Sequence, residues 1–245
     1  ESLTADTFDS ADTRKVVTMN RIAGLLALLV VAGILGSCQQ SSSRIEVTVS
    51  PAHVVLAPGA TQEFSIAVSG TPKKDVVLSV TGGEVNGDGP SVEYTAPANL
   101  GAFVLTATST VDTKASAEAR IVLEVVGQVR PDVDTRIESE DRSVSVHVPA
   151  GSVEDEAEVA VRGIDISDPV PGLDYAVAGV GIDSSRELMQ LARVTFDPQR
   201  APLAEGQAHQ IYRRTGDADE WRRIPSFSID DRLGVATSSF SEFVL

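Results

Sequence analysis

The chain has 245 residues, room for one or two ordinary domains, and 42% hydrophobic residues, enough to build cores although only 4% are aromatic. Its formal net charge of −15 disfavours nucleic acid as a partner, because Lys and Arg supply most of the affinity for phosphate backbones. Cys38 is the single cysteine, which excludes an internal disulfide and a cysteine-based zinc site. We expect core burial alone to hold the fold, without a cofactor.

The N-terminal region has the layout of a secretory signal peptide. A short cationic segment begins at Met19, and about 14 apolar or small residues follow at 22–35. This run is shorter than the roughly 20 residues of a membrane-spanning helix. We therefore predict a signal peptide at 19–37, and we interpret the polar residues 1–18 as an over-extended reading frame or a vector-derived remnant.

The end of the apolar run reads Leu35-Gly36-Ser37-Cys38 and resembles the lipobox of bacterial lipoproteins. The resemblance implies cleavage between Ser37 and Cys38, a diacylglycerol on the Cys38 thiol and palmitate-type acylation of the new amine. Two or more acyl chains anchor a protein stably to a lipid membrane, whereas one chain binds only marginally. Gln39 in place of Asp implies the outer membrane if the cell has two membranes. A secreted protein without lipid is the alternative.

Residues 38–43 comprise the lipidated cysteine and a Ser-rich tether, and strand-like runs then recur about every ten residues. The sequence predicts an all-β fold with two tandem β-sandwiches, at 44–127 and 128–245. In the first, apolar and polar residues alternate, and the strand-like runs lie at 45–50, 64–68, 76–80, 92–94, 103–108 and 119–126. About seven strands in this length are typical of an immunoglobulin-type sandwich.

Two segments of the first module, VTVSPAHVVLAPGATQEFSIAVSGTPKKDVVLSVTGG and YTAPANLGAFVLTATS, resemble bacterial Ig-like domains near the group-2 type. Such domains often carry a tryptophan in the third strand. Leu78 stands at that position, so other residues must fill the centre of the core. The resemblance implies the fold and leaves the function open, because adhesins, spacers and carbohydrate binders share it.

In the second module, Val144, Val146 and Val148 alternate with polar residues at 143, 145 and 147, which predicts one buried and one solvated face. Further strand-like runs lie at 159–166, 175–182, 192–196, 209–214, 221–224, 233–237 and 240–245, with a hairpin loop at 215–220. The segments VSVHVPAGSVEDEAEVAV, VTFDP, YRRTGDADEWRRIP and VATSSFSEFVL together resemble the β-sandwich shared by zonula occludens proteins, netrin receptors and ankyrins.

Some relatives of that sandwich cleave their own chain at a Phe-Ser bond that follows a histidine. Phe240-Ser241 stands at the corresponding place, but Ser239 occupies the histidine position. The base that would activate the Ser241 hydroxyl is therefore missing, and we expect no self-cleavage.

The three histidines, His53, His147 and His209, lie far apart in sequence, and neither His-Glu-x-x-His nor Gly-x-Ser-x-Gly occurs. A catalytic site would require His147 or His209 to fold near a serine and a carboxylate in a cleft. We expect these histidines to be solvated on strand surfaces instead, and we assign no catalytic residue.

Two further features have both a functional and a structural interpretation. Acidic clusters at 154–158, 217–220 and 230–231 could supply oxygen ligands for calcium. None has the spacing of a calcium loop, and charged turns that keep strand edges soluble explain them better, so we predict no metal site. Trp221 could stack on a sugar, although a place in the core or at a sheet edge agrees better with its neighbours Arg222 and Arg223.

These features together predict a lipid-anchored, non-enzymatic protein of the bacterial cell envelope with a structural, adhesive or ligand-binding role. An envelope polymer or a surface protein is the expected partner besides the membrane. One alternative is a hydrolase or self-cleaving module in the second sandwich. The other is a carbohydrate-binding module, which would need Trp221 or Tyr212 exposed on a flat face.

Overall fold

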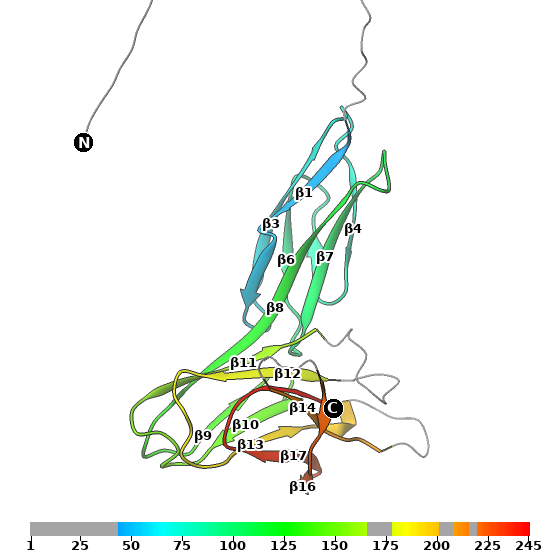
Figure 1. The fold of residues 1–245 in the computed structure, drawn as a ribbon. Helices are drawn as coiled ribbons and strands as arrows, with labels where there is room; N and C mark the ends of the chain where they lie inside the picture. Colours follow the sequence, from blue (N-terminus) through cyan, green and yellow to red (C-terminus); the bar gives the residue numbers. More distant parts are fainter. Residues whose placement is uncertain (1–43, 166–177, 201–207, 216–219) are drawn as a thin grey trace, which may run out of the picture. The chain divides into compact units, whose positions relative to one another are not determined.

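The computed structural model describes residues 44–165, 178–200, 208–215 and 220–245 (Figure 1). These residues form an all-β structure of antiparallel sheets, as predicted, with one short 3-10 helix, η1 (Pro198–Arg200). The predicted signal peptide, the cleavage position Ser37, Cys38 and the tether lie outside the described residues. Within the described residues, no helix has the length and apolarity to cross a membrane.

The first sandwich is built from two sheets with an Ig-like strand order. Its strands are β1 (Glu46–Ser50), β2 (His53–Leu56), β3 (Thr61–Ser69), β4 (Val76–Val80), β5 (Glu84–Asn86), β6 (Ser91–Thr95), β7 (Ala102–Ser109) and β8 (Ser116–Val129). One sheet has the order β1-β3-β6-β5, and the other has β4-β7-β8 with β2 parallel to β8. In immunoglobulin folds the first, second, fifth and fourth strands likewise share one sheet, and the third, sixth and seventh share the other.

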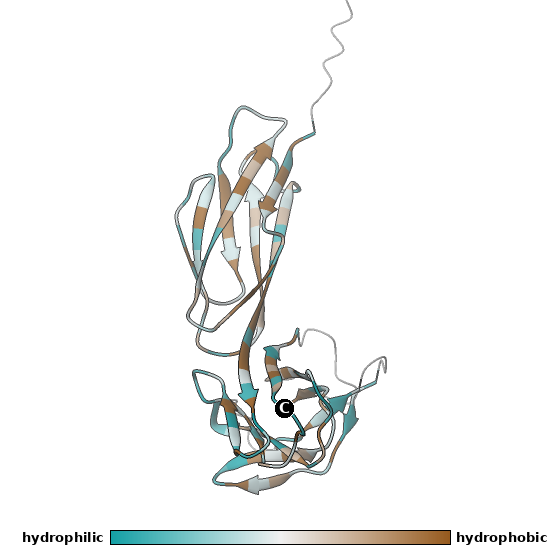
Figure 2. Cartoon of the chain, turned by 90° about the vertical axis from the view of Figure 1, so that its left-hand side faces the viewer, coloured by the Kyte–Doolittle hydropathy of each residue, from teal (hydrophilic) through white to brown (hydrophobic). Residues whose placement is uncertain are grey.

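Alternating burial along the strands creates the first core. In β3, Phe64, Ile66 and Val68 are buried, and Ser65 and Ala67 between them are exposed. Figure 2 shows hydrophobic and paler, more polar bands alternating along strands of this sandwich. Phe64 and Tyr94 are fully buried, with ring centroids 6.3 Å apart and ring planes at 81°. Leu78 is only partly buried at the edge of this cluster. The centre of the core is thus filled by two aromatic rings from β3 and β6, in place of a tryptophan in β4.

Tyr94 makes the first sandwich sensitive to alkali. Burial raises the pKa of Tyr94 to about 12, from about 10 in an unfolded chain, while its hydroxyl donates a hydrogen bond to Gly82 O at 3.0 Å. The unfolded state therefore loses its proton first, and stability falls as the pH rises from about 10 to about 12. We expect denaturant unfolding at several pH values to show this loss, and the variant Tyr94→Phe to show less of it. An identical pH profile for the two proteins would contradict the prediction.

One continuous strand, β8, contributes to both sandwiches. Residues 116–123 of β8 pair with β7 and β2, and residues 124–129 pair with β11. Gly127 lies within this second half, and a Cβ there would collide with the Ile137 side chain. The domain boundary predicted between residues 127 and 128 therefore falls inside strand β8. Gly127 does not end the strand; it allows the Ile137 side chain to pack closely against the backbone. The buried apolar residues form two hydrophobic clusters. The members of one lie between residues 47 and 123, and the members of the other lie between residues 129 and 245.

The second sandwich also consists of two antiparallel sheets. Its further strands are β9 (Thr135–Glu138), β10 (Val144–Val148), β11 (Ala157–Gly163), β12 (Gly179–Ser184), β13 (Ala192–Phe196), β14 (Tyr212–Arg214), β15 (Arg222–Arg223), β16 (Phe227–Ile229), β17 (Arg232–Thr237) and β18 (Glu242–Val244). One sheet has the order β16-β17-β13-β10-β9, and the other runs β15-β14-β18-β12-β11 to β8. Val146, Val161, Phe196 and Phe243 belong to the core between them.

Four strands were not predicted: β2, β5, β9 and β16. Each has only three or four residues, and the similarly short β14, β15 and β18 were predicted only because they lie within longer strand-like runs. The predicted hairpin loop at 215–220 lies largely outside the described residues. A second tight connection joins β16 to β17, where Asp230 and Asp231 have φ values of 48° and 60°. Positive φ at both central residues is the signature of a type I′ hairpin turn, so the acidic pair at 230–231 is explained by turn geometry.

Candidate functional site

The candidate site is a row of basic side chains across the sheet formed by β9, β10, β13 and β17. Val146 and Val194 point into the core, so the residues next to them in β10 and β13 point to the opposite face. In the strand register, His147 of β10 lies directly opposite Arg136 of β9 on one side and Arg193 of β13 on the other. Like charges at opposite positions repel each other, so this row stays stable only with nearby counter-charges or a neutral imidazole.

A cavity of about 130 Å³ lies at this row. It is lined by Arg136, His147, Arg193 and Arg232, by the hydroxyl-bearing residues Ser145 and Thr195, and by Ile229 and Asp230. Three guanidinium groups therefore face one carboxylate around a small cavity, in a chain whose net charge is −15. We call this cavity the basic pocket.

The surroundings of His147 disfavour its charged form. Arg193 Nη2 lies 3.0 Å from His147 Nδ1, and because a guanidinium can only donate, Nδ1 accepts and the ring proton resides on Nε2. Burial lowers the pKa of His147, and Arg193 and Arg136 lower it further, whereas Asp134 opposes them. Among the described residues, no carboxylate lies within ion-pair distance of Arg193. Its positive charge has the imidazole as its hydrogen-bond partner.

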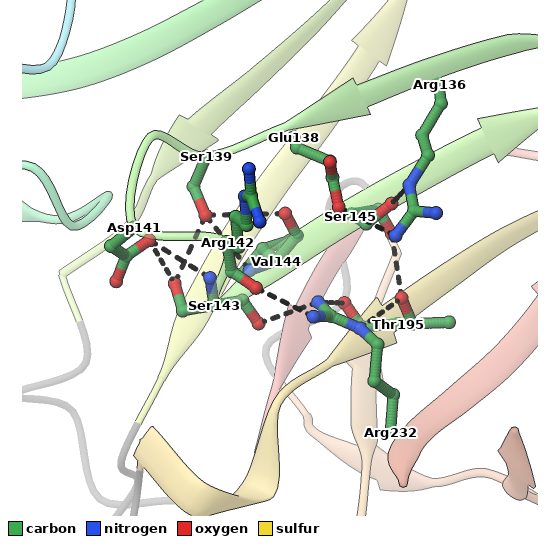
Figure 3. Close-up of polar contacts among 10 residues, drawn as sticks. All are labelled: Arg136, Glu138, Ser139, Asp141, Arg142, Ser143, Val144, Ser145, Thr195 and Arg232. Atoms are coloured by element: carbon green, nitrogen blue, oxygen red, sulfur yellow. Dashed lines mark hydrogen bonds and ion pairs between the residues drawn. The ribbon is translucent and has the colours of Figure 1, made fainter. Parts of the chain in front are cut away.

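Arg136 is oriented by two neighbours on its own side of the sheet (Figure 3). Its Nε donates to Ser145 Oγ at 3.0 Å, and its Nη2 donates to Glu138 Oε1 at 2.7 Å. The Arg136 side chain is more than half exposed, so the pair with Glu138 adds little stability and mainly sets the direction of the guanidinium.

Arg232 of β17 serves a structural purpose at the base of the pocket. Nε donates to Thr195 Oγ1 at 3.0 Å, and Nη1 donates to Arg142 O at 2.7 Å. Nη2 donates to Ser143 O at 3.2 Å and to Thr195 O at 3.3 Å (Figure 3). All three guanidinium nitrogens are thus bound within the protein, and Arg232 adds positive charge to the pocket without offering a free face.

The hairpin between β9 and β10 fixes two of the carbonyls that Arg232 binds. Asp141 Oδ1 accepts from Ser143 N at 3.0 Å and from Ser143 Oγ at 2.8 Å. Ser139 Oγ accepts from Val144 N at 3.0 Å. These local bonds stabilise a turn in which Arg142 has a φ of 60°, a conformation that non-glycine residues rarely adopt.

The prediction that position 145 faces solvent is wrong. Ser145 is only 3% exposed, although it does lie on the face opposite to the core. The reason is the length of its neighbours: Arg136 binds the Ser145 hydroxyl from the adjacent strand, and Arg232 binds Thr195 on the other side. Short side chains between long ones are covered even on a sheet face that does not enter the core.

The groups that contact Ser241 do not favour self-cleavage. Its hydroxyl accepts from Arg213 Nε at 2.6 Å, and Arg213 Nη2 also contacts Ser239 O at 3.1 Å and Ser239 Oγ at 2.7 Å. A guanidinium cannot remove a proton from a hydroxyl at physiological pH. The Ser241 carbonyl accepts from Ile182 N at 2.9 Å, so this part of the chain is paired within the sheet.

The two other histidines lie apart from the row. His53 is in β2 of the first sandwich. His209 lines an open depression of about 700 Å³ together with Asp230, Asp231 and Ser228, and this depression adjoins the basic pocket, with which it shares Ile229, Asp230 and Arg232. His209 therefore shares a concavity with a serine and carboxylates, but a depression this open lacks the enclosed geometry of a nucleophilic site.

Trp221 does not form an exposed platform for a sugar. It is 8% exposed and packs with Ile164, Val244 and the partly buried Tyr212. The Arg214 guanidinium lies over its ring, 4.7 Å from the centroid, and also contacts Glu242 at 2.7 Å. The aromatic side chains that a carbohydrate-binding module would need are thus engaged in packing.

The acidic clusters are dispersed in the described part of the chain. Asp155 and Glu156 form exposed ion pairs with Arg186 and Arg130. In the described ranges, no group of three or more His, Cys, Asp or Glu side chains is placed to hold a metal ion. Residues 217–219 lie outside those ranges.

Comparisons with known proteins add little to this description. No protein-family model matches the chain, and no curated protein matches it. A crystal structure of an ICAM-5 D1–D4 ectodomain fragment is similar at 12% identity with a TM-score of 0.26, over 81% of this chain and 69% of that chain. At this TM-score the similarity carries no argument about fold or function.

Proposed function

We propose that the chain is a lipid-anchored protein of the bacterial cell envelope that binds a ligand through its second sandwich. The basic pocket is the observation that supports binding over catalysis. Ser145 Oγ contacts Arg136 and His147 Nδ1 contacts Arg193, so the hydroxyl and the imidazole have guanidinium partners instead of each other. A pocket with positive charge and donors, but without an activated nucleophile, is suited to holding an anion.

The sequence supports the anchor, and the short distance along the chain supports a location close to the membrane. The first strand, β1, begins at Glu46, eight residues after Cys38. A fully extended chain spans at most about 3.6 Å per residue, so the tether reaches no more than about 30 Å. The first sandwich would therefore stay near the bilayer, where an envelope polymer or a surface protein is the expected partner.

The variant Cys38→Ala tests the anchor. We expect the wild-type protein in the membrane fraction to have the mass of residues 38–245 plus acyl chains. We expect Cys38→Ala to keep its signal peptide and to lack lipid, because only a thiol accepts the diacylglycerol. Intact mass spectrometry of the membrane fraction makes the measurement, and Ser42→Ala in the tether is the matched control, with wild-type mass and location. A wild-type protein without lipid, or one that begins elsewhere, would overturn the proposal.

A further inference from the structure

We propose that the basic pocket binds a phosphate group, either free or as a monoester on a larger envelope molecule, between Arg136 and Arg193. This assignment deepens the proposed ligand-binding role by naming the class of ligand. It rests on the pocket alone and does not depend on the lipid at Cys38.

The first argument is the charge of the pocket. Three guanidinium groups and one carboxylate, that of Asp230, line the cavity. Arg136 is also paired with Glu138, whereas Arg193 is half-buried with an imidazole as its partner. A half-buried cation without an anionic partner is unfavourable, and an anion in the cavity would remove that cost. The anion would compensate Arg193 above all, because Arg136 already has Glu138 as a counter-charge.

The second argument is the number of donors that remain. Arg136 uses Nε and Nη2 on Ser145 and Glu138, and Arg193 uses one Nη on His147. Arg193 therefore keeps at least one pair of parallel N–H groups for an oxyanion, and Arg136 keeps its Nη1 donors. Their remaining N–H groups, with His147 Nε2–H, come from three strands that lie about 5 Å apart. A phosphate group has three or four acceptor oxygens and up to two negative charges for these donors, whereas a carboxylate has two oxygens and one charge.

The third argument is size. Liquid water occupies about 30 Å³ per molecule, so the cavity of about 130 Å³ has the space of roughly four waters. That space suits a compact oxyanion. A phosphate group at the end of a larger molecule could enter while the rest of that molecule stays outside.

Phosphate binding should be coupled to the protonation of His147. Without a ligand, the pKa of this imidazole is lowered by burial and by the nearby charges of Arg193 and Arg136, whereas Asp134 raises it. The other charged groups around the row are Glu138 in β9, Arg232 in β17 and Asp230 in the preceding turn. A bound oxyanion favours the charged imidazole, so phosphate should raise the pKa of His147 and, by linkage, should bind more tightly to the protein in which His147 is charged.

Nuclear magnetic resonance of the histidines tests the proposal, because the chain has only three of them. The full chain, labelled in its imidazole rings, would be titrated with sodium phosphate. We expect the His147 signal to move saturably and its pKa to rise, while His53 in the first sandwich stays unchanged as an internal reference. If the His147 signal moves no more than that of His53, the pocket does not bind phosphate.

A matched pair of variants tests the residue assignment. Arg193→Gln should weaken phosphate binding at least tenfold, whereas Arg186→Gln should change it less than twofold. Arg186 is an exposed arginine whose ion pair with Asp155 spans 4.0 Å, so the two variants lose the same charge. Arg136→Gln, on an exposed side chain, provides a second pocket variant if Arg193→Gln does not fold. Equal affinities in all of these proteins would overturn the assignment.

Three probes separate the sources of the ligand. Sodium acetate should bind at least tenfold more weakly than phosphate, and equal binding would overturn the choice of phosphate over carboxylate. Tighter binding of glycerol phosphate than of inorganic phosphate would support a phosphate monoester on a larger molecule, and the reverse order would support free phosphate. Because the imidazole signal reports the pocket and the mass measurement reports lipid, failure here is distinguishable from failure of the anchor.

Discussion

Replacing Arg232 with alanine should lower the free energy of unfolding of the second sandwich by about 2–4 kcal/mol. The guanidinium donates to Arg142 O, Ser143 O and Thr195 O and to the Thr195 hydroxyl, so one side chain connects β17 to β13 and to the β9–β10 hairpin. A hydrogen bond from a charged donor contributes about 1.5–3 kcal/mol. The four contributions do not add, because water can reach the freed carbonyls at this half-exposed position.

Two further variants separate the shape of Arg232 from its charge. Arg232→Lys keeps the charge but has no planar fork, so we expect an intermediate loss of about 1–2 kcal/mol. Arg222→Ala removes an exposed arginine from β15 of the same sandwich and should cost less than about 0.5 kcal/mol. Urea unfolding followed by Trp221 fluorescence makes the measurement, because Trp221 is the only tryptophan and lies in the second sandwich. Arg232→Ala and Arg222→Ala with equal stabilities would contradict the structural purpose of Arg232.

The longer strands could be predicted because alternation is a property of the sequence itself. Apolar positions at 64, 66 and 68 recur at the period of a strand, and β3 buries these three side chains. The predicted run at 192–196 coincides with β13 for the same reason. Short strands could be predicted only where a longer strand-like run contains them, as for β14, β15 and β18, and β9, which contributes Arg136 to the pocket, lies in no such run.

The basic pocket could not be predicted, because it depends on the pairing of strands. Arg136, His147 and Arg193 are 11 and 46 positions apart along the chain, and only the register of β9, β10 and β13 brings them into one row. The sequence shows that His147 lies on the polar side of an alternating strand, but it does not show which residues lie opposite. The sequence does show that Arg193 lies within a predicted strand and that His147 faces away from the core in another. It does not show that these two strands are neighbours.

In the first sandwich, replacing Phe64 with alanine should lower the free energy of unfolding by about 3–5 kcal/mol. Phe64 is fully buried at the centre of the core, with its ring edge-to-face against Tyr94. Removal of the ring loses its transfer free energy and leaves a cavity between the two sheets, because β3 is paired on both sides and cannot collapse inward. The aromatic pair with Tyr94, worth about 0.5–1.5 kcal/mol beyond its buried area, is lost as well.

A conservative variant separates the contribution of the aromatic ring to stability from that of the apolar volume it fills. Phe64→Leu keeps most of the apolar volume and should cost about 1–2 kcal/mol, and Phe103→Ala at the partly buried edge of the same core should cost less than Phe64→Ala. Amide hydrogen exchange of β3 and β6 measures these losses locally, because exchange from central strands reports the opening of the core. If Phe64→Ala lost less than about 1 kcal/mol, the two aromatic rings would not be the centre of this core. Leu78, which pairs with β7 and stands where similar domains carry a tryptophan, would then be the better candidate for the packing centre.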